Sequence, residues 1–275
     1  MFEFSLQANE GAARSAVFET PHGVVLTPTF MPVGTQGTVK SLIMEEVDAL
    51  GAQVVLANTY HLYLRPGHDL VAQLGGLHDF MRWQGPILTD SGGYQVFSLA
   101  KIRDVHDDGV DFQSHIDGSK HRFTPELVME IQRTLGADVI MAFDECPPGG
   151  ANRATARAAN VRTLRWLERC RGRFAELGAQ EDGAEQALFP VLQGNVFDDL
   201  RRAHARQFMD LEDWPGYGIG GLSVGESKDD MWRVLDILNE ELPSDRPRYL
   251  MGVGYPDDLL EAVARGCDLF DCVAP

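Results

Sequence analysis

The stretch PELVMEIQRTLGADVIMAF, residues 125–143, joins a helical pattern to a short apolar run. Its first part places apolar residues at the spacing of one helix face, and Pro125 suits the first turn of a helix. Its second part, Asp138–Phe143, is almost continuously apolar, as is typical of a strand that is buried on both faces. A helix that leads into a buried strand predicts one unit of an α/β fold with parallel strands.

Similar apolar runs alternate with helical patterns along the chain. The predicted strands are Thr29–Val33, Val54–Asn58, Ile87–Asp90, Asp138–Phe143, Leu188–Gln193, Tyr217–Gly221, Tyr249–Gly252 and Leu269–Cys272. Further helices are predicted at residues 41–50, 231–242 and 256–266. Eight parallel strands in 275 residues favour a (β/α)8 TIM-type barrel. A doubly wound open sheet is the alternative, because periodicity alone does not separate the two folds.

Two regions add β-hairpins to this pattern. In residues 14–33, apolar and polar side chains alternate before the turn TPHG, and a second strand-like run follows it. This pattern predicts a hairpin ahead of the barrel. The stretch after the third strand, residues 98–124, contains Asp117-Gly118, a pair typical of a hairpin turn. The last strand runs to Pro275 without the helix that should cover it. We therefore expect residues 1–275 to form a single barrel domain that is incomplete at its C-terminus.

The composition argues against several classes of protein. No apolar run reaches the roughly 18–20 residues of a membrane span, and the first residues do not resemble a signal peptide, so we expect a cytoplasmic protein. The four cysteines show no CxxC spacing, so neither a disulfide framework nor a metal site is predicted. The 24 basic and 41 acidic residues give a net charge of −17, which opposes charge-driven binding to nucleic acid outside a local docking site.

Polar residues follow the predicted strands at the points where these end. Asp90, Asp144 and Asp271 each come directly after an apolar run, and Gln193 follows another. Each aspartate taken alone is compatible with a helix cap or a turn. In a barrel, however, these strand ends meet at one mouth, where paired carboxylates suit glycosyl chemistry.

The stretch DSGGYQ, residues 90–95, is the most specific of these strand ends. The two glycines, Gly92 and Gly93, allow backbone amides to approach a ligand closely. Tyr94 behind them offers a flat face for stacking. A pair of glycines is by itself most often only a turn.

Six ordered motifs extend this pattern over nearly the whole chain: TDSGGYQVFSL, FDECPP, PVLQGN, GGLSVGE, YLMGVG and LFDCVAP. In this order and spacing they closely resemble the tRNA-guanine transglycosylases, the queuine tRNA-ribosyltransferase family. NTYHLYLRPG and SHIDGSKHRFTPE match as well, although His61 in the first receives no chemical role. The resemblance implies a barrel enzyme that exchanges guanine at the tRNA anticodon wobble position for a 7-deazaguanine.

The resemblance also implies site residues. Asp271 is expected to be the nucleophile and Asp90 the general acid/base. Asp144 is expected to bind the two donors of the guanine edge, and the Gln193 amide and the Gly220 N–H its O6. Tyr94 and Met251 are expected to sandwich the ring. The full set expected to bind the base is Asp90, Ser91, Gly92, Gly93, Tyr94, Asp144, Cys146, Gln193, Gly220, Gly221, Leu222, Val224 and Met251.

One segment is expected to lie against the tRNA. It consists of Gly252, Val253, Gly254, Tyr255, Pro256, Asp257 and Asp258.

Val224 and Cys146 match bacterial relatives, and the bulk of Val224 favours the small base 7-aminomethyl-7-deazaguanine. Cys146 as the nucleophile is disfavoured, because nothing near it in sequence would lower the pKa of its thiol.

The resemblance further implies partners and a metal. Full-length relatives continue with a CxCxxC…H zinc site, so we expect a structural Zn²⁺ whose ligands lie beyond Pro275, and no cofactor within this chain. The expected partners are tRNA with guanine at the wobble position and a 7-deazaguanine base, with no membrane, and a homodimer when full length. Two alternatives stay open: a retaining glycoside hydrolase on the same barrel, and a non-catalytic tRNA-binding accessory subunit.

Overall fold

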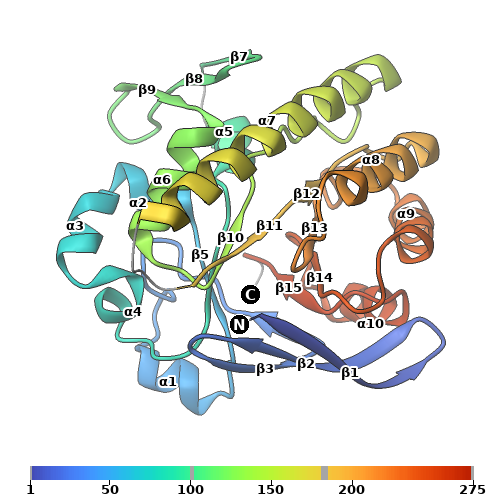
Figure 1. The fold of residues 1–275 in the computed structure, drawn as a ribbon, viewed down its shortest axis with the longest axis horizontal. Coiled ribbons are helices and arrows are strands. Elements are labelled where there is room, and N and C mark those ends of the chain that lie inside the picture. The colour runs from blue at the N-terminus through green and yellow to red at the C-terminus, as the bar shows by residue number, and fades with distance from the viewer. Residues whose placement is uncertain (1, 100–101, 181–184, 274–275) are drawn as a thin grey trace.

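The computed structural model describes residues 2–99, 102–180 and 185–273, whose chain forms an α/β fold with two parallel sheets (Figure 1). The first sheet has the order β11 (Ala187–Phe189), β10 (Val139–Met141), β6 (Ile87–Thr89), β5 (Val55–Ala57). The second has the order β12 (Val191–Leu192), β13 (Tyr217–Ile219), β14 (Arg248–Leu250), β15 (Leu269–Asp271), β4 (Thr29–Met31). Each predicted strand is thus found, with Leu188–Gln193 divided at Pro190.

The two sheets are linked at both edges. Val33, just after β4, forms a parallel bridge with Leu56 of β5, and the Gly34 N–H donates to the Leu56 carbonyl at 2.6 Å. At the other edge, Ala142 and Gly218 donate to the carbonyls of Phe189 and Pro190. The chain from β11 to β12 therefore pairs with β10 on one side and with β13 on the other.

Helices cover the outside of these strands (Figure 1). They are α1 (Met44–Ala49), α2 (Thr59–Leu64), α3 (His68–Gln73), α4 (Gly76–Met81), α5 (Gly93–Leu99), α6 (Pro125–Leu135), α7 (Arg153–Gln180), α8 (Asp198–Leu211), α9 (Lys228–Glu241) and α10 (Pro256–Ala264). The predicted helices correspond to α1, α6, α9 and α10. Helix α6 begins where Thr124 Oγ1 accepts the Leu127 N–H at 3.2 Å, and it ends at Gly136 with φ 78°.

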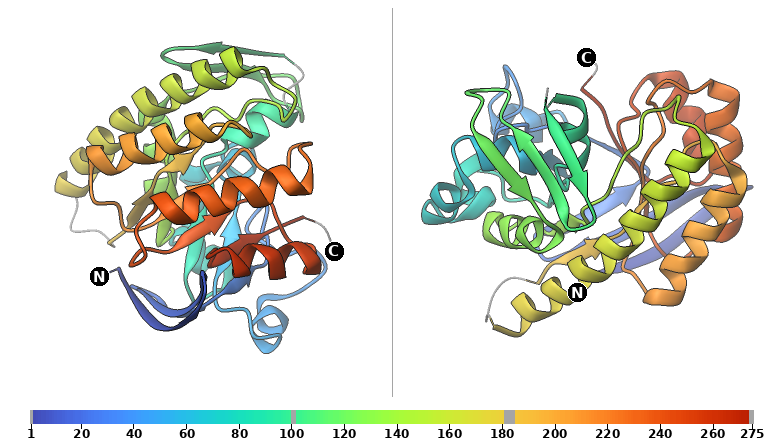
Figure 2. Two further views of the ribbon diagram at one scale, coloured as in Figure 1. Left: turned by 90° about the vertical axis from the view of Figure 1, so that its right-hand side faces the viewer. Right: turned by 90° about the horizontal axis from the view of Figure 1, so that it is seen from above.

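Two antiparallel sheets lie at opposite sides of the molecule (Figure 2). The N-terminal sheet contains β1 (Glu3–Glu10), β2 (Ala13–Thr20) and β3 (Gly23–Thr27), so the predicted hairpin gains a strand in β1, whose polar, mostly exposed sequence gave no signal. The insertion sheet contains β7 (Arg103–His106), β8 (Gly109–Gln113) and β9 (Lys120–Phe123). The predicted hairpin at Asp117-Gly118 is the β8–β9 pair, and β7 again adds a third strand.

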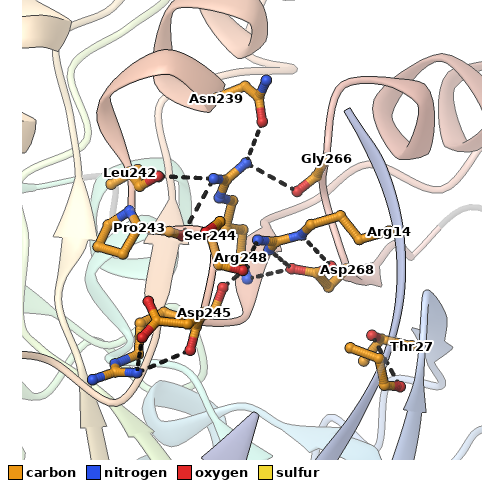
Figure 3. A network of polar contacts seen from close by, with 12 residues as sticks. Arg14, Thr27, Asn239, Leu242, Pro243, Ser244, Asp245, Arg248, Gly266 and Asp268 are labelled. Atoms are coloured by element: carbon orange, nitrogen blue, oxygen red, sulfur yellow. Dashed lines mark hydrogen bonds and ion pairs between the residues drawn. The ribbon is translucent and has the colours of Figure 1, made fainter. Parts of the chain in front are cut away.

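A buried ion pair fastens the N-terminal sheet to the start of β15 (Figure 3). Both carboxylate oxygens of Asp268 bond the Arg14 guanidinium of β2, with Nε–Oδ1 at 3.1 Å, and Oδ2 also accepts the Arg248 N–H at 2.7 Å. Arg14 donates further to the carbonyls of Ser244 and Arg246. The charge of Asp268 is therefore matched inside the protein.

No helix in the described ranges is long and apolar enough to cross a membrane.

Candidate active site

A cavity of about 580 Å³ opens where the parallel strands end. Ligand pockets generally have volumes of roughly 300–1,000 Å³, so this cavity has the size of a small-molecule site. All of the residues expected to bind the base line it: Asp90, Ser91, Gly92, Gly93, Tyr94, Asp144, Cys146, Gln193, Gly220, Gly221, Leu222, Val224 and Met251. Asp271 and Gly252 line it too. Residues encoded about 180 positions apart therefore share one cavity.

Asp90 is buried at the end of β6 and is held by neutral donors. Its Oδ1 accepts the N–H groups of Thr59 at 2.9 Å and Gly92 at 3.2 Å. Its Oδ2 accepts the side-chain amides of Asn58 at 2.6 Å and Gln95 at 2.9 Å. Burial nevertheless raises the pKa of Asp90 to about 6, with a further contribution from the charge of Asp271. A carboxyl group with this pKa can both give and take a proton near neutral pH.

Asp271 ends β15 and faces the same cavity. Its Oδ1 accepts the Tyr249 hydroxyl at 2.7 Å and the Gly252 N–H at 2.7 Å. In the described part of the chain, no hydrogen bond reaches Oδ2, which leaves that oxygen available to a ligand. Burial raises the pKa of Asp271, and its two donors oppose that rise. The arrangement fixes one oxygen and exposes the other.

Asp144 follows β10 and forms a polar pair with Gln193. Gln193 Nε2 donates to Asp144 Oδ2 at 2.7 Å, and Ser91 Oγ donates to Oδ1 at 3.2 Å. Burial raises the pKa of Asp144 to about 6, and the charges of Asp90 and Glu145 add to this effect. The carboxylate has lone pairs to spare for the two donors of a guanine edge.

One expected contact is wrong. The Gly220 N–H donates to the Leu192 carbonyl at 3.0 Å, as a continuation of the pairing between β12 and β13, so it cannot also bind O6 of a purine. The next residue, Gly221, also lines the cavity. A backbone donor for O6 would therefore have to come from another residue that lines the cavity.

Cys146 does not have the character of a nucleophile. Its side chain is buried, and burial together with the charge of Asp144 raises the pKa of the thiol to about 12. A thiol with this pKa stays protonated at neutral pH and is a weak nucleophile. Cys146 is instead a buried part of the cavity wall.

Two flat or pliable side chains, Tyr94 and Met251, line the cavity where the ring is expected to be sandwiched. Tyr94 is the second residue of α5 and remains 53% exposed, whereas Met251 is partly buried after β14. The exposed face of Tyr94 is therefore free to stack on a planar ring.

The segment expected to contact tRNA divides into two parts. Gly252 lines the cavity, and Tyr255 is 59% exposed beyond it. Val253 and Asp258 are buried, and Asp258 bonds the ammonium group of Lys228. Among the segment's side chains, those of Tyr255, Pro256 and Asp257 are thus exposed.

Several lining residues were given no role from the sequence. Asn58, Gln95 and Tyr249 hold the two catalytic candidates, and His61 and His115 line the wall beside Asp90. Asn58 directly follows β5, so its place at a strand end was the one available signal. His115 comes from the insertion sheet, where its Nδ1 bonds the Tyr60 hydroxyl at 2.9 Å. The sequence contains no pattern that links it to this cavity.

A family model described as queuine tRNA-ribosyltransferase matches residues 9–275. The chain belongs to the queuine tRNA-ribosyltransferase family. A queuine tRNA-ribosyltransferase of Desulforamulus reducens is 60% identical over 263 residues, covering 96% of this chain and 69% of the relative. Relatives of the same name from Herpetosiphon aurantiacus and Desulforudis audaxviator are 58% and 56% identical, covering all of this chain and 68% and 72% of theirs.

Potential metal ligands lie close together at one place in the described residues, but not in the cysteine-rich form expected for a zinc site. The sequence contains no CxCxxC pattern, and within residues 2–99, 102–180 and 185–273 no cysteine belongs to a group of three potential ligands. His22, His78 and Asp138 do form such a group, but the two imidazole rings stack at 3.6 Å with 22° between their planes. Their nitrogen lone pairs therefore lie in nearly parallel planes and do not converge on one ion. Asp138 is hydrogen-bonded to His22 at 2.7 Å and to the Ile87 N–H at 2.8 Å, as in a structural cluster.

Proposed function

We propose that this chain is a tRNA-guanine transglycosylase of queuosine biosynthesis, a pentosyltransferase that replaces guanine at the wobble position of tRNA. The observation that carries the proposal is the shared cavity of Asp90, Asp144 and Asp271, in which two carboxylates face a pocket with a third carboxylate and an amide at one side. Family membership supports the same reaction. The barrel is part of this proposal, and the strand pairing at both sheet edges supports it.

The first half of the reaction uses Asp271 as the nucleophile. Its Oδ2 attacks C1′ of the ribose, and an ester bond forms as the C1′–N9 bond breaks. The electron pair of that bond goes to guanine, which takes a proton from Asp90. Because the Tyr249 hydroxyl and the Gly252 N–H bind only Oδ1, they orient the carboxylate without blocking the attacking oxygen.

The second half reverses these steps with another base. Asp90 takes a proton from the incoming base, whose N9 attacks C1′. The ester bond breaks and its electron pair returns to Asp271. Two inversions give overall retention at C1′, and no redox partner is consumed. The pKa of about 6 suits Asp90 for both proton transfers.

The base is recognised through its edge. Asp144 accepts the two donors of guanine, N1–H and the 2-amino group, while the second hydrogen of Gln193 Nε2 and the Gly221 N–H serve O6. Each good bidentate pair supplies about 1–3 kcal/mol of discrimination, so several contacts must act together to exclude adenine. Tyr94 and Met251 hold the ring between them.

The incoming base in this proposal is 7-aminomethyl-7-deazaguanine. Val224 lines the cavity, and its bulk favours a small substituent at position 7 over a cyclic one. The partner is tRNA with guanine at the wobble position, approached by the segment that contains Tyr255, and the full-length enzyme is a homodimer in the cytoplasm. Neither alternative, a glycoside hydrolase or a non-catalytic subunit, accounts for a carboxylate–amide pair shaped to a purine edge.

The test is exchange of labelled guanine into substrate tRNA by the chain and two variants. Asp271→Asn removes the nucleophile and is expected to lower exchange by at least about 10³-fold, since loss of a covalent nucleophile removes the low-barrier path. The control is Asp229→Asn, an exposed aspartate in the first turn of α9, which should exchange like the parent. Exchange that survives in Asp271→Asn would contradict the assignment.

A further inference from the structure

The loop on the O6 side of the cavity is backed by a buried cation. Arg201, in the first turn of α8, has no exposed surface. Its guanidinium donates only to backbone carbonyls, namely those of Asn195 at 2.7 Å, Leu192 at 3.1 Å, Gly220 at 2.9 Å and Gly221 at 3.1 Å. Within the described part of the chain, no carboxylate accepts a hydrogen bond from it. Burying an unpaired charge is costly, so its retention at this point calls for a role.

The direction of two peptide groups suggests that role. The cis peptide bonds among the described residues lie at Thr27-Pro28 and Arg65-Pro66, so the Gly220–Gly221 and Gly221–Leu222 peptides are trans. In a trans peptide the C=O and N–H point in opposite directions. Both carbonyls point at Arg201, so both N–H groups point away from it, on residues that line the cavity. The guanidinium withdraws electron density from the carbonyls and makes these N–H groups stronger donors.

Arg201 also helps to fix Gln193, which lines the cavity next to this loop. His204 Nδ1 accepts the Gln193 N–H at 3.0 Å, which requires that nitrogen to be unprotonated. Burial and the charge of Arg201 lower the pKa of His204 to about 3, so the imidazole stays neutral and keeps this bond. Gly221 adopts φ 64°, and a Cβ there would lie 2.3 Å from Gln193 Oε1. The loop is thus rigid and accepts no side chain at Gly221.

We propose that Arg201 is a positioning residue that polarises the Gly220–Gly221 and Gly221–Leu222 peptides and makes their N–H groups an anion-binding site for O6 of the purine. The inference rests on the proposed function. As the C1′–N9 bond breaks, negative charge spreads over the purine as far as O6. Fixed donors at O6 therefore bind the departing base more strongly than the base still joined to ribose. This difference lowers the activation free energy for breaking the C1′–N9 bond.

The test compares guanine with 2-aminopurine, which lacks both O6 and the N1–H. The missing N1–H weakens 2-aminopurine equally in the parent and in the variant, so the ratio of the two changes in Kd reports on position 6. Guanine carries O6, whereas 2-aminopurine has only hydrogen there and reports its own binding by fluorescence. Arg201→Lys keeps the charge but has three donors and no planar fork, so it cannot hold four carbonyls. We expect its Kd for guanine to rise about tenfold, the size of one charged hydrogen bond, while its Kd for 2-aminopurine changes less than about twofold. The matched control is Arg202→Lys, one residue along, where the arginine bonds Glu240 and Glu241 at the surface and neither Kd should change.

Equal losses for both purines in folded Arg201→Lys would mean a purely structural role and would overturn the inference alone. A parent chain that binds neither purine would overturn the proposed function, and this inference with it. If Arg201→Lys does not fold, the parent chain is titrated with each purine while the backbone amide resonances of Gly221 and Leu222 are followed by NMR. We expect both amide protons to move downfield with guanine and not with 2-aminopurine, because only guanine offers O6 as an acceptor. Amide protons that respond equally to the two purines would contradict the inference.

Discussion

At the start of β15, Asp268 is buried against the guanidinium of Arg14, whereas at the end of the same strand Asp271 receives a hydroxyl and a backbone N–H. Asp90 and Asp144 resemble Asp271, because their donors are amides, hydroxyls and backbone N–H groups. One end of the strands therefore matches buried charge with opposite charge, and the other leaves it unmatched. Burial raises the pKa of Asp268 too, but there the full positive charge of Arg14 opposes the rise, whereas the hydrogen bonds that oppose it at Asp90 and Asp144 come from neutral donors.

Changing Asp90 should have the largest effect, and on activity alone. Asp90→Asn removes the acid/base group but keeps a similar shape, so kcat for guanine exchange is expected to fall by about 10²–10⁴-fold. Its thermal unfolding temperature should fall only slightly, because removal of the buried charge is favourable, whereas the Asn amide nitrogen leaves two of the four N–H donors without an acceptor. A variant that exchanges guanine like the parent would contradict the catalytic role of Asp90. A variant that unfolds at a much lower temperature would mean that Asp90 mainly stabilises the fold.

Asp268→Asn should do the opposite. It leaves the buried Arg14 guanidinium without its counter-charge, which typically costs about 3–5 kcal/mol. Urea unfolding should show a free energy of unfolding lower by that amount, while kcat measured well below the unfolding transition stays close to that of the parent. A variant that is as stable as the parent but has lost exchange activity would contradict the structural role of Asp268.

Asp144→Asn sharpens the comparison through pH. The pKa of Asp144 is raised from 3.8 to about 6 in the folded chain, so the folded state binds more protons than the unfolded state between these values. The parent therefore loses stability as pH rises through that window, by at most about 3 kcal/mol. The variant lacks this loss, so its free energy of unfolding relative to the parent should be about 1–3 kcal/mol higher at pH 8 than at pH 4. A pH-independent difference would mean that the charge of Asp144 is matched after all.

The smallest expected effect is that of Tyr249→Phe. The Tyr249 hydroxyl lowers the pKa of Asp271 by bonding its ionised form, so its removal raises that pKa. The acid limb of the pH–rate profile should move to higher pH, with a loss of about threefold at low pH that largely recovers at pH 8, the size of one neutral hydrogen bond. Tyr217→Phe, in the neighbouring strand β13, is the control and should leave the profile unchanged.

The parallel strands could be predicted from apolar runs and turn pairs, whereas most residues around the cavity were expected from the resemblance of the motifs to a known family. The donors around Asp90 could not, because they come from residues near 58 and near 92, and only the pairing of β5 with β6 brings these together. The error at Gly220 has a similar cause. Whether an N–H faces the cavity or the neighbouring strand depends on where the ladder ends, and the sequence does not mark that residue. Arg201 escaped notice because nothing in a helix sequence shows that an arginine is buried.

The most direct test of the account is to trap the covalent intermediate. The chain is mixed with substrate tRNA and a guanine analogue that stalls the second displacement, then denatured and separated by size. We expect a protein–RNA adduct that survives denaturation and whose RNA is attached to the peptide containing Asp271, and we expect no adduct with Asp271→Asn. An adduct that still forms in Asp271→Asn, or one attached to another residue such as Cys146, would contradict the account.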